Sequence, residues 1–210
     1  MPGRLFLTRD MAAVAAWCGT PDAVPTDPPR RNIAPGEEVL LRGPGGLGHA
    51  RWGMIPVGRV NARGRPVMET IVNARSETVF DKTAYRGTGR AVVPVDGWYE
   101  WTGPAGRKQA WEIRLADGGL MGFAAITDDW TAPDGRVLAQ VATLTCGPNA
   151  DVAPVHDRMG CILMAEEIAP WLAAPEAEAR AMLRPLAEGR LAIRKLDRAE
   201  WPGGPAGAAR

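Results

Sequence analysis

The sequence predicts an α+β fold: a single domain with a curved, barrel-like, mainly antiparallel sheet and peripheral helices. Three observations lead to this class. A chain of 210 residues is long enough to bury one sizeable core. Six or more short segments are rich in β-branched and aromatic residues and are separated by turn signals. The few segments with helical periodicity lie toward the two ends of the chain, so we expect them to cover a sheet.

Several of the expected strands are joined by recognisable turns. Residues 37–43 and 49–55 are typical of a hairpin whose turn is the Gly-Pro-Gly-Gly run between them. Pro94 and Gly97 predict a bulge or bend inside the strand at 91–101. Asp117-Gly118 predicts a hairpin turn. The remaining strands are expected at 109–115, 120–126, 136–146 and 191–196, with short ones before Asn73 and after His156.

Three segments have the apolar periodicity of amphipathic helices. Thr8 is the expected N-cap of the first of them. Ser76 is the expected cap of a further short helix that ends at Thr83. The three periodic segments are residues 7–17, 165–173 and 175–186.

Loops and the end of the chain set the domain limits. Residues 19–31 and 57–66 are polar and rich in proline, glycine or arginine, which indicates exposed loops. The glycine- and alanine-rich end has the composition of disorder. We therefore expect one domain over 1–198 and a disordered tail over 199–210.

Composition and charge are those of an ordinary globular protein and give no sign of a strongly charged binding protein. Hydrophobic residues make up 46% and charged residues 23% of the chain, as in ordinary globular proteins. The net charge of +1 gives no overall attraction to DNA or to a membrane surface. Arginine greatly outnumbers lysine, which fits either a GC-rich genome or phosphate binding by individual arginines. Composition alone leaves both explanations open.

Neither a membrane segment nor a metal site is expected. No apolar run approaches the roughly 20 residues that a spanning helix needs. The three cysteines have neither a disulfide framework nor metal-ligand spacing. The start of the chain lacks the pattern of a secretory signal. We expect a cytoplasmic protein without metal or cofactor.

A few polar residues stand where chemistry is plausible. Glu100 lies between aromatic residues, where partial burial would raise the carboxyl pKa and suit acid–base work. His156 precedes an apolar strand, and Asn73 and Arg75 lie where a strand ends. Each also has an ordinary explanation, as an exposed strand residue, a structural histidine or a turn. No phosphate-binding glycine loop or nucleophile elbow is present.

Five segments together resemble one family. NIAPG, RWGMIP, NARSET, VPVDGWYEW and HDRMGCIL occur in the order and spacing of the SOS-response-associated peptidase (SRAP) family. The resemblance covers about residues 2–195. It implies a single α+β domain with a barrel-like core, single-stranded DNA containing abasic sites as partner, and covalent capture of those sites. We also expect a monomer that works in the cytoplasm at the nucleoid.

The resemblance also assigns site residues. Asn73, Glu100 and His156 would support the reaction at position 2. Arg4, Arg75 and Arg158 would contact DNA, and Trp52 and Trp101 would pack the site or stack on bases. Glu100 would help to open the sugar ring and move the proton of the amine, and His156 would donate to the sugar oxygen or relay a proton. Asn73 would fix the attacking amine.

Position 2 departs from the family pattern. Family members have cysteine after the start Met, and its amine and thiol together form a stable thiazolidine with the abasic aldehyde; this chain has Pro2. Cys18 is no substitute, because it lies on the apolar face of the first helix. Pro2 as catalytic residue, once Met1 is removed, would form a transient iminium or drive strand cleavage.

Other readings of position 2 stay open. The protein would bind abasic or single-stranded DNA without covalent chemistry if Met1 stays in place. Pro2 would also be explained as an engineered or sequencing change in an ordinary cysteine enzyme. A peptidase acting on other proteins is the weakest alternative, because no cysteine remains at the terminus.

Overall fold

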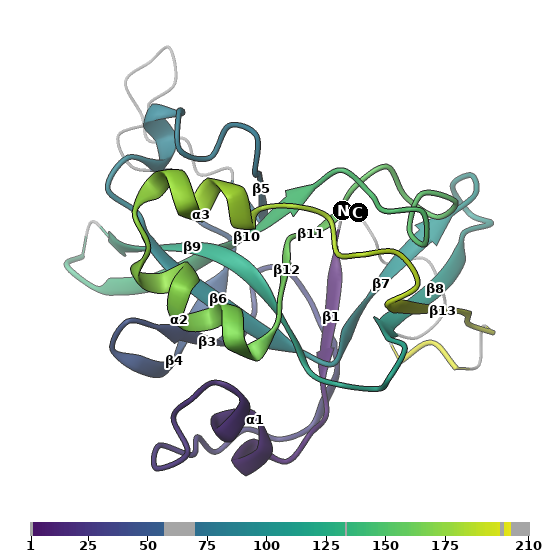
Figure 1. Ribbon diagram of the computed structural model, residues 1–210, viewed down its shortest axis with the longest axis horizontal. Helices are drawn as coiled ribbons and strands as arrows, with labels where there is room; N and C mark the ends of the chain where they lie inside the picture. Colours follow the sequence, from purple (N-terminus) through teal and green to yellow (C-terminus); the bar gives the residue numbers. More distant parts are fainter. Residues whose placement is uncertain (1, 57–69, 133, 198–199, 203–210) are drawn as a thin grey trace.

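The computed structural model describes residues 2–56, 70–132, 134–197 and 200–202, and its strands form two sheets (Figure 1). The first sheet has five strands, and every neighbouring pair is antiparallel. In spatial order the strands are β13 (Leu191–Lys195), β8 (Gln109–Leu115), β7 (Gly97–Thr102), β1 (Arg4–Leu7) and β2 (Arg30–Ile33).

The second sheet curls into a ring. Strands β10, β4, β3, β6 and β9 follow one another, and β9 pairs again with β10. This closure confirms the predicted barrel-like, mainly antiparallel sheet; the exceptions are β4 and β5, which run parallel to β10. The strands are β3 (Glu38–Gly43), β4 (Gly46–Trp52), β5 (Asn73–Arg75), β6 (Gly89–Val95), β9 (Met121–Thr131), β10 (Val137–Cys146), β11 (Met159–Gly160) and β12 (Ile162–Leu163).

One hydrophobic core joins the two sheets. Trp98 of β7 packs edge-on against Phe123 of β9, with ring centroids 5.4 Å apart. Both side chains are fully buried, as are Leu5 of β1 and Leu144 of β10. The five-stranded sheet is therefore anchored to the barrel through aromatic packing, and the chain forms a single α+β domain.

A sharp bend passes the chain from one sheet to the other at Asp96. The Asp96 carboxylate accepts hydrogen bonds from the backbone and hydroxyl of Thr8, at 2.7 and 2.9 Å, and from Nε of Arg9 at 2.6 Å. This confirms the bend predicted in residues 91–101. It corrects the role of Thr8, which secures the bend and does not cap helix α1 (Met11–Trp17); Asp10 precedes that helix without a side-chain cap.

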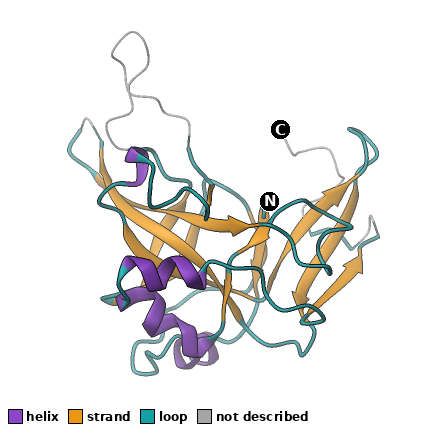
Figure 2. Ribbon diagram, turned by 45° about the horizontal axis from the view of Figure 1, so that its top comes forward, coloured by secondary structure: helices purple, strands orange, loops and turns teal. Residues whose placement is uncertain are grey.

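Three α-helices of the described residues lie at the periphery, as predicted (Figures 1 and 2). Helix α2 (Ala165–Ala173) has the expected bounds and packs on β6, where its Trp171 Nε1 donates to the Ala91 carbonyl at 2.9 Å. Helix α3 (Glu176–Met182) ends earlier than expected, because Pro185 disfavours helical backbone just before it. None of the described helices is long and apolar enough to span a membrane.

Three local predictions need correction. Residues 76–81 form turns before a single 3-10 turn, η1 (Thr83–Tyr85), because the backbone N–H of Ser76 extends the pairing with β10 by donating to Thr145. Asp117-Gly118 is a turn, but it links strands of different sheets and so makes no hairpin. The short strand begins at Asn73, where we expected it to end.

Two residues beyond the expected domain end at residue 198 make contacts with the domain. Trp201 contacts Tyr99 edge-on at 4.9 Å, and Glu200 pairs with Arg194 at 2.6 Å. These two residues fall inside the segment predicted as a disordered tail. Residues 203–210, like the predicted loop at 57–66, lie outside the described residues.

Candidate functional site

The candidate site begins where the short strand β5 runs beside β10. Asn73 stands opposite Thr143 in this parallel pair. Thr143 Oγ1 donates to Asn73 Oδ1 at 2.6 Å, and Asn73 Nδ2 donates to the carbonyl oxygen of Pro2 at 2.9 Å. Because the hydroxyl engages the amide oxygen, the amide nitrogen must face Pro2. Asn73 thus holds the Pro2 carbonyl, and its role in fixing the attacking amine stays a prediction.

Glu100 reaches the same region from strand β7. Arg4 pairs with Tyr99 in the antiparallel register of β1 and β7, so the chain before Arg4 runs past Glu100. The Glu100 side chain is only 4% exposed. Its burial raises the pKa of the carboxyl from its ordinary range to about 7. Glu100 therefore changes protonation near neutral pH, as an acid–base group must.

His156 is presented by the loop that follows β10. The Asn149 side chain ties this loop down by accepting from the Val152 N–H at 3.0 Å and donating to the Leu186 carbonyl at 3.1 Å. The His156 backbone N–H in turn donates to the Val152 carbonyl at 3.0 Å. The loop is thus held by its own hydrogen bonds, and the imidazole has a defined position.

The ring nitrogens of His156 have different partners. The Arg158 backbone N–H donates to Nδ1 at 2.9 Å, which leaves the proton of the neutral ring on Nε2. Nδ1 also lies 2.8 Å from Asp157, but a neutral Nδ1 cannot accept and donate at once, and the Asp157 carboxylate is 88% exposed. We therefore assign the acceptor role. Nε2 lies 3.9 Å from Glu100 Oε2, and burial lowers the pKa of His156.

The three candidate DNA-binding arginines differ in how firmly other residues hold their side chains. Arg158 is held by both carboxylate oxygens of Glu77, at 2.5 and 2.9 Å, and by the Thr145 carbonyl. Arg4 Nη1 donates to the side chain of Asn32 at 3.2 Å. Arg75 is exposed at the end of β5, and no carboxylate of the described residues pairs with it. Of these three side chains, the Arg75 guanidinium is therefore the most available to bind a phosphate.

The two candidate tryptophans occupy unlike positions. Trp52 has no exposed surface and donates from Nε1 to the Val72 carbonyl at 3.1 Å. A buried indole cannot stack on a base, so of its two expected roles only packing beneath the site is left as a prediction. Trp101 follows Glu100 on β7 and therefore projects from the opposite face of the sheet. There it contacts Trp201 edge-on at 5.1 Å.

The structure adds two side chains that sequence reasoning missed. Thr143 orients Asn73, and its signal is that it is one of three polar residues in a strand that is mostly apolar, with Gln140 and Thr145. Trp111 stands directly opposite Glu100 on β8 and shares its face of the sheet. Its Nε1 donates to Thr102 Oγ1 at 2.9 Å, which fixes the indole beside the carboxyl. The alternation of side chains along residues 109–115 was the signal that could have predicted which face of the strand carries Trp111.

The described residues show no metal-binding cluster at this site, and the three cysteines of the chain are buried. Among the described residues no group of three or more His, Cys, Asp or Glu side chains is placed to hold a metal ion. Cys18 is buried in the core, as expected, and burial raises its pKa to about 11. Cys146 and Cys161 are also buried and free. The site itself brings together a buried carboxyl, an imidazole and a clamped residue 2.

Comparison with known proteins places the chain in a family. A family model described as SOS response associated peptidase (SRAP) matches residues 1–199, and the chain belongs to this family. It is similar to the abasic site processing protein YoqW of Bacillus subtilis, with 32% identity over 152 residues that cover 69% of this chain and 66% of the relative. It is also similar to the abasic site processing protein HMCES of Gallus gallus, with 30% identity, covering 64% of this chain and 48% of the relative.

Solved structures confirm the fold. A crystal structure of a Bacteroides thetaiotaomicron protein matches with a TM-score of 0.79 at 21% identity, covering 92% of this chain and 91% of the other. A phage-related protein of Bordetella bronchiseptica matches with a TM-score of 0.72 at 28% identity, covering 92% and 93%. The chain spans about two thirds of its bacterial relative and about half of the chicken one.

Proposed function

We propose that this protein binds abasic sites in single-stranded DNA and reacts with the ring-opened sugar aldehyde through the amine of Pro2 after Met1 is removed. One observation carries the proposal. Residue 2 is buried and clamped by Asn73 in the region where Glu100 has a pKa of about 7. The names of the relatives supply the substrate class.

The first step is attack of the Pro2 nitrogen on the aldehyde carbon. A free terminal amine has a pKa near 8, so a useful neutral fraction exists at pH 7. A C–N bond forms, the carbonyl π electrons move to oxygen, and the Glu100 carboxylate takes the N–H proton and passes it to that oxygen. The product is a neutral carbinolamine.

The second step is loss of water from the carbinolamine. Glu100, protonated again from solvent, gives its proton to the hydroxyl, the C–O bond breaks with loss of water, and the nitrogen lone pair forms a cationic iminium. Because the pKa of Glu100 is about 7, both of its forms are available at neutral pH. His156, neutral and with its proton on Nε2, would donate a hydrogen bond to the sugar oxygen.

The fate of the iminium distinguishes this chain from a cysteine enzyme. Pro2 offers no thiol to close a thiazolidine, so water can reverse the linkage. Alternatively, a base removes the acidified proton beside the iminium carbon, and the 3′ phosphate leaves with its electron pair, which cuts the strand. We therefore propose a transient covalent adduct with lyase activity.

A non-covalent binding role is the second candidate, and Pro2 itself favours it. If Met1 remains, the Pro2 nitrogen is a tertiary amide and cannot attack. The exposed Arg75 would still offer a phosphate contact. In either case we place the protein at the nucleoid in the cytoplasm, acting as a monomer.

Borohydride trapping tests the proposal. The protein, with Met1 removal checked by intact mass, is incubated with an abasic single-stranded oligonucleotide with and without borohydride. We expect an adduct only after reduction. Pro2→Cys is the matched control, and it should give an adduct without reduction. Binding without any adduct in the Pro2 protein would support the non-covalent role instead.

A further inference from the structure

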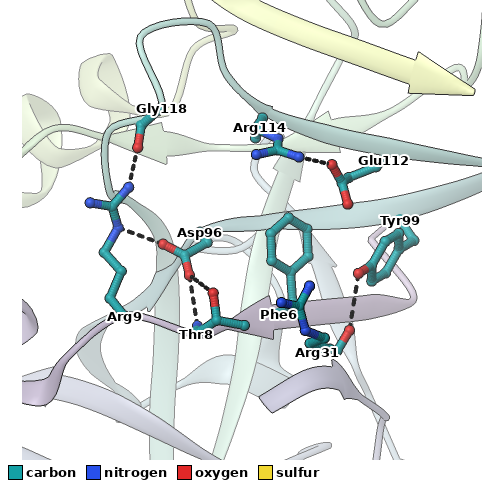
Figure 3. Close-up of a pocket in the computed structure, with 9 residues that line it drawn as sticks. All are labelled: Phe6, Thr8, Arg9, Arg31, Asp96, Tyr99, Glu112, Arg114 and Gly118. Carbon is teal, nitrogen blue, oxygen red and sulfur yellow. Dashed lines mark hydrogen bonds and ion pairs between the residues drawn. The ribbon is translucent and has the colours of Figure 1, made fainter. Parts of the chain in front are cut away.

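A polar pocket lies on the other face of the five-stranded sheet. Its volume is about 290 Å³, and Figure 3 shows side chains entering it from β1, β2, β7 and β8. Tyr99 lines this pocket and precedes Glu100 on β7, so the two side chains project from opposite faces. The pocket is therefore separate from the candidate site and stands behind it.

The two carboxylates of the pocket are already neutralised. Asp96 accepts from Thr8 and Arg9, as described above. Glu112 pairs with Arg114 and lies 3.6 Å from Nε of Arg194. Both carboxylates are nearly buried, with side chains 11% exposed. They therefore offer little to an incoming cation.

The arginines of the pocket retain unused donors. Arg9 engages Asp96 through Nε and the Gly118 carbonyl through Nη2, and no hydrogen bond of the described residues uses its Nη1 (Figure 3). No carboxylate of the described part of the chain pairs with Arg31, whose backbone carbonyl accepts from Tyr99 at 3.0 Å. The lining thus presents guanidinium donors with one net positive charge, two carboxylates against three arginines.

We propose that this pocket binds a phosphate ester. Guanidinium groups match phosphate oxygens, and neither Arg9 Nη1 nor the Arg31 guanidinium has an acceptor among the described residues. The volume of about 290 Å³ is near the lower end of small-ligand pockets, roughly 300–1,000 Å³, and leaves room for a sugar beside the phosphate. Phe6 and Tyr99 supply the apolar wall for that sugar.

The proposal is independent of covalent chemistry at Pro2, and its test uses other probes. Inorganic phosphate and dAMP are titrated into the full chain by calorimetry. We expect dAMP to bind more tightly than phosphate, and Arg31→Ala to weaken dAMP at least tenfold. Arg136→Ala is the control, because Arg136 pairs with Asp134 in an exposed turn away from the pocket. Absence of binding by wild type, or equal effects of the two variants, would overturn the proposal.

Glu112→Gln provides a second variant with an effect of opposite sign. It keeps the shape of the side chain and releases Arg114 from its ion pair, so dAMP should bind several-fold more tightly. A variant that merely damaged the fold would weaken binding. Weaker dAMP binding by Glu112→Gln, with an unchanged melting temperature, would contradict the phosphate site.

Oligonucleotides of two lengths identify the source of the phosphate ester. If a DNA strand that also reaches the candidate site fills the pocket, Arg31→Ala should weaken a long abasic strand by a larger factor than a trinucleotide too short to span both sites. If only a free nucleotide fills it, Arg31→Ala should weaken dAMP and leave the long strand unaffected. Both outcomes support the pocket as a phosphate-ester site, and adduct formation should be unchanged in either case.

Discussion

Asn73 Nδ2 donates a hydrogen bond of 2.9 Å to the carbonyl oxygen of Pro2. The contact joins residue 2 to the strand beside β10, although 71 positions separate the two residues in the chain. The amide cannot turn freely, because Thr143 holds its oxygen. Residue 2 is therefore positioned by the barrel as well as by the start of β1.

Asn73→Asp should slow adduct formation about tenfold or more. The carboxylate keeps an acceptor for Thr143 but replaces the donor that faces Pro2, and an unmatched buried oxygen costs about 1–3 kcal/mol. The measurement is the rate of borohydride-trapped adduct on an abasic oligonucleotide. Asn32→Asp is the control, since Asn32 accepts from Arg4 through an oxygen that Asp retains. Equal rates for the two variants would exclude the clamp.

Thr143→Val should have a smaller effect in the same direction. Valine keeps the shape of the buried side chain but frees the Asn73 amide to turn, and one such hydrogen bond contributes about 1 kcal/mol. We expect a rate reduced several-fold with DNA affinity unchanged, measured by single-turnover trapping and by fluorescence anisotropy. A variant that lost affinity and kept its rate would count against an orienting role.

Glu100→Gln should remove the pH dependence of the reaction near neutrality. In the native protein the plot of rate against pH should show an inflection around pH 7, where the Glu100 carboxyl titrates. The amide cannot transfer the proton, so we expect the rate to fall by about 10²–10⁴ and its profile to flatten in this range. Trapping rates between pH 5 and 9 provide the comparison, with Asp157→Asn as the exposed control. An inflection near 7 that survives in Glu100→Gln would assign it to another group.

The same substitution should change how stability depends on pH. The folded pKa of Glu100 is raised to about 7, so between pH 4.5 and 7 the folded state holds more protons than the unfolded state. Its contribution to the free energy of unfolding is therefore present at low pH and lost as pH rises. As the pH rises through this window, the free energy of unfolding of Glu100→Gln should increase relative to that of the native protein, by up to about 3 kcal/mol. Urea unfolding of both proteins at pH 4.5 and 8 measures this change. The same difference between the two proteins at both pH values would refute the raised pKa.

Arg75 and Arg158 should respond differently to loss of the guanidinium. Arg75→Ala should reduce the salt slope of DNA binding by about 1 and leave the melting temperature unchanged, because its side chain is exposed. Arg158→Ala should lower the melting temperature by several degrees, since it leaves the Thr145 carbonyl and Glu77 without their partner. Salt titrations and calorimetric melting separate the two. A larger slope change for Arg158→Ala would reverse their assigned roles.

The fold was largely readable from local patterns. The alternation in residues 109–115 and the Pro94–Gly97 bend predicted β8 and the break between β6 and β7 correctly. The failures arose where a distant partner decides the structure. Thr8 has the chemistry of a helix cap, but Asp96 engages its hydroxyl from 88 positions away.

The candidate site was predictable in its residue types and not in its contacts. Glu100 was expected to have a raised pKa from its aromatic neighbours, and burial produces that shift. The resemblance named Asn73, but only the pairing of β5 with β10 reveals Thr143 behind it. The buried position of Trp52 and the outward face of Trp101 likewise depend on sheet closure and register.

The most direct test of the covalent account is to locate the reduced adduct by peptide mass mapping. The chain has only three lysines, Lys82, Lys108 and Lys195, so few amines compete with the terminus. The account predicts that the mass added by the reduced abasic sugar resides on the peptide that begins with Pro2, and that replacing all three lysines by arginine leaves it there. An adduct found on a lysine, or none in protein shown to begin with Pro2, would contradict the account.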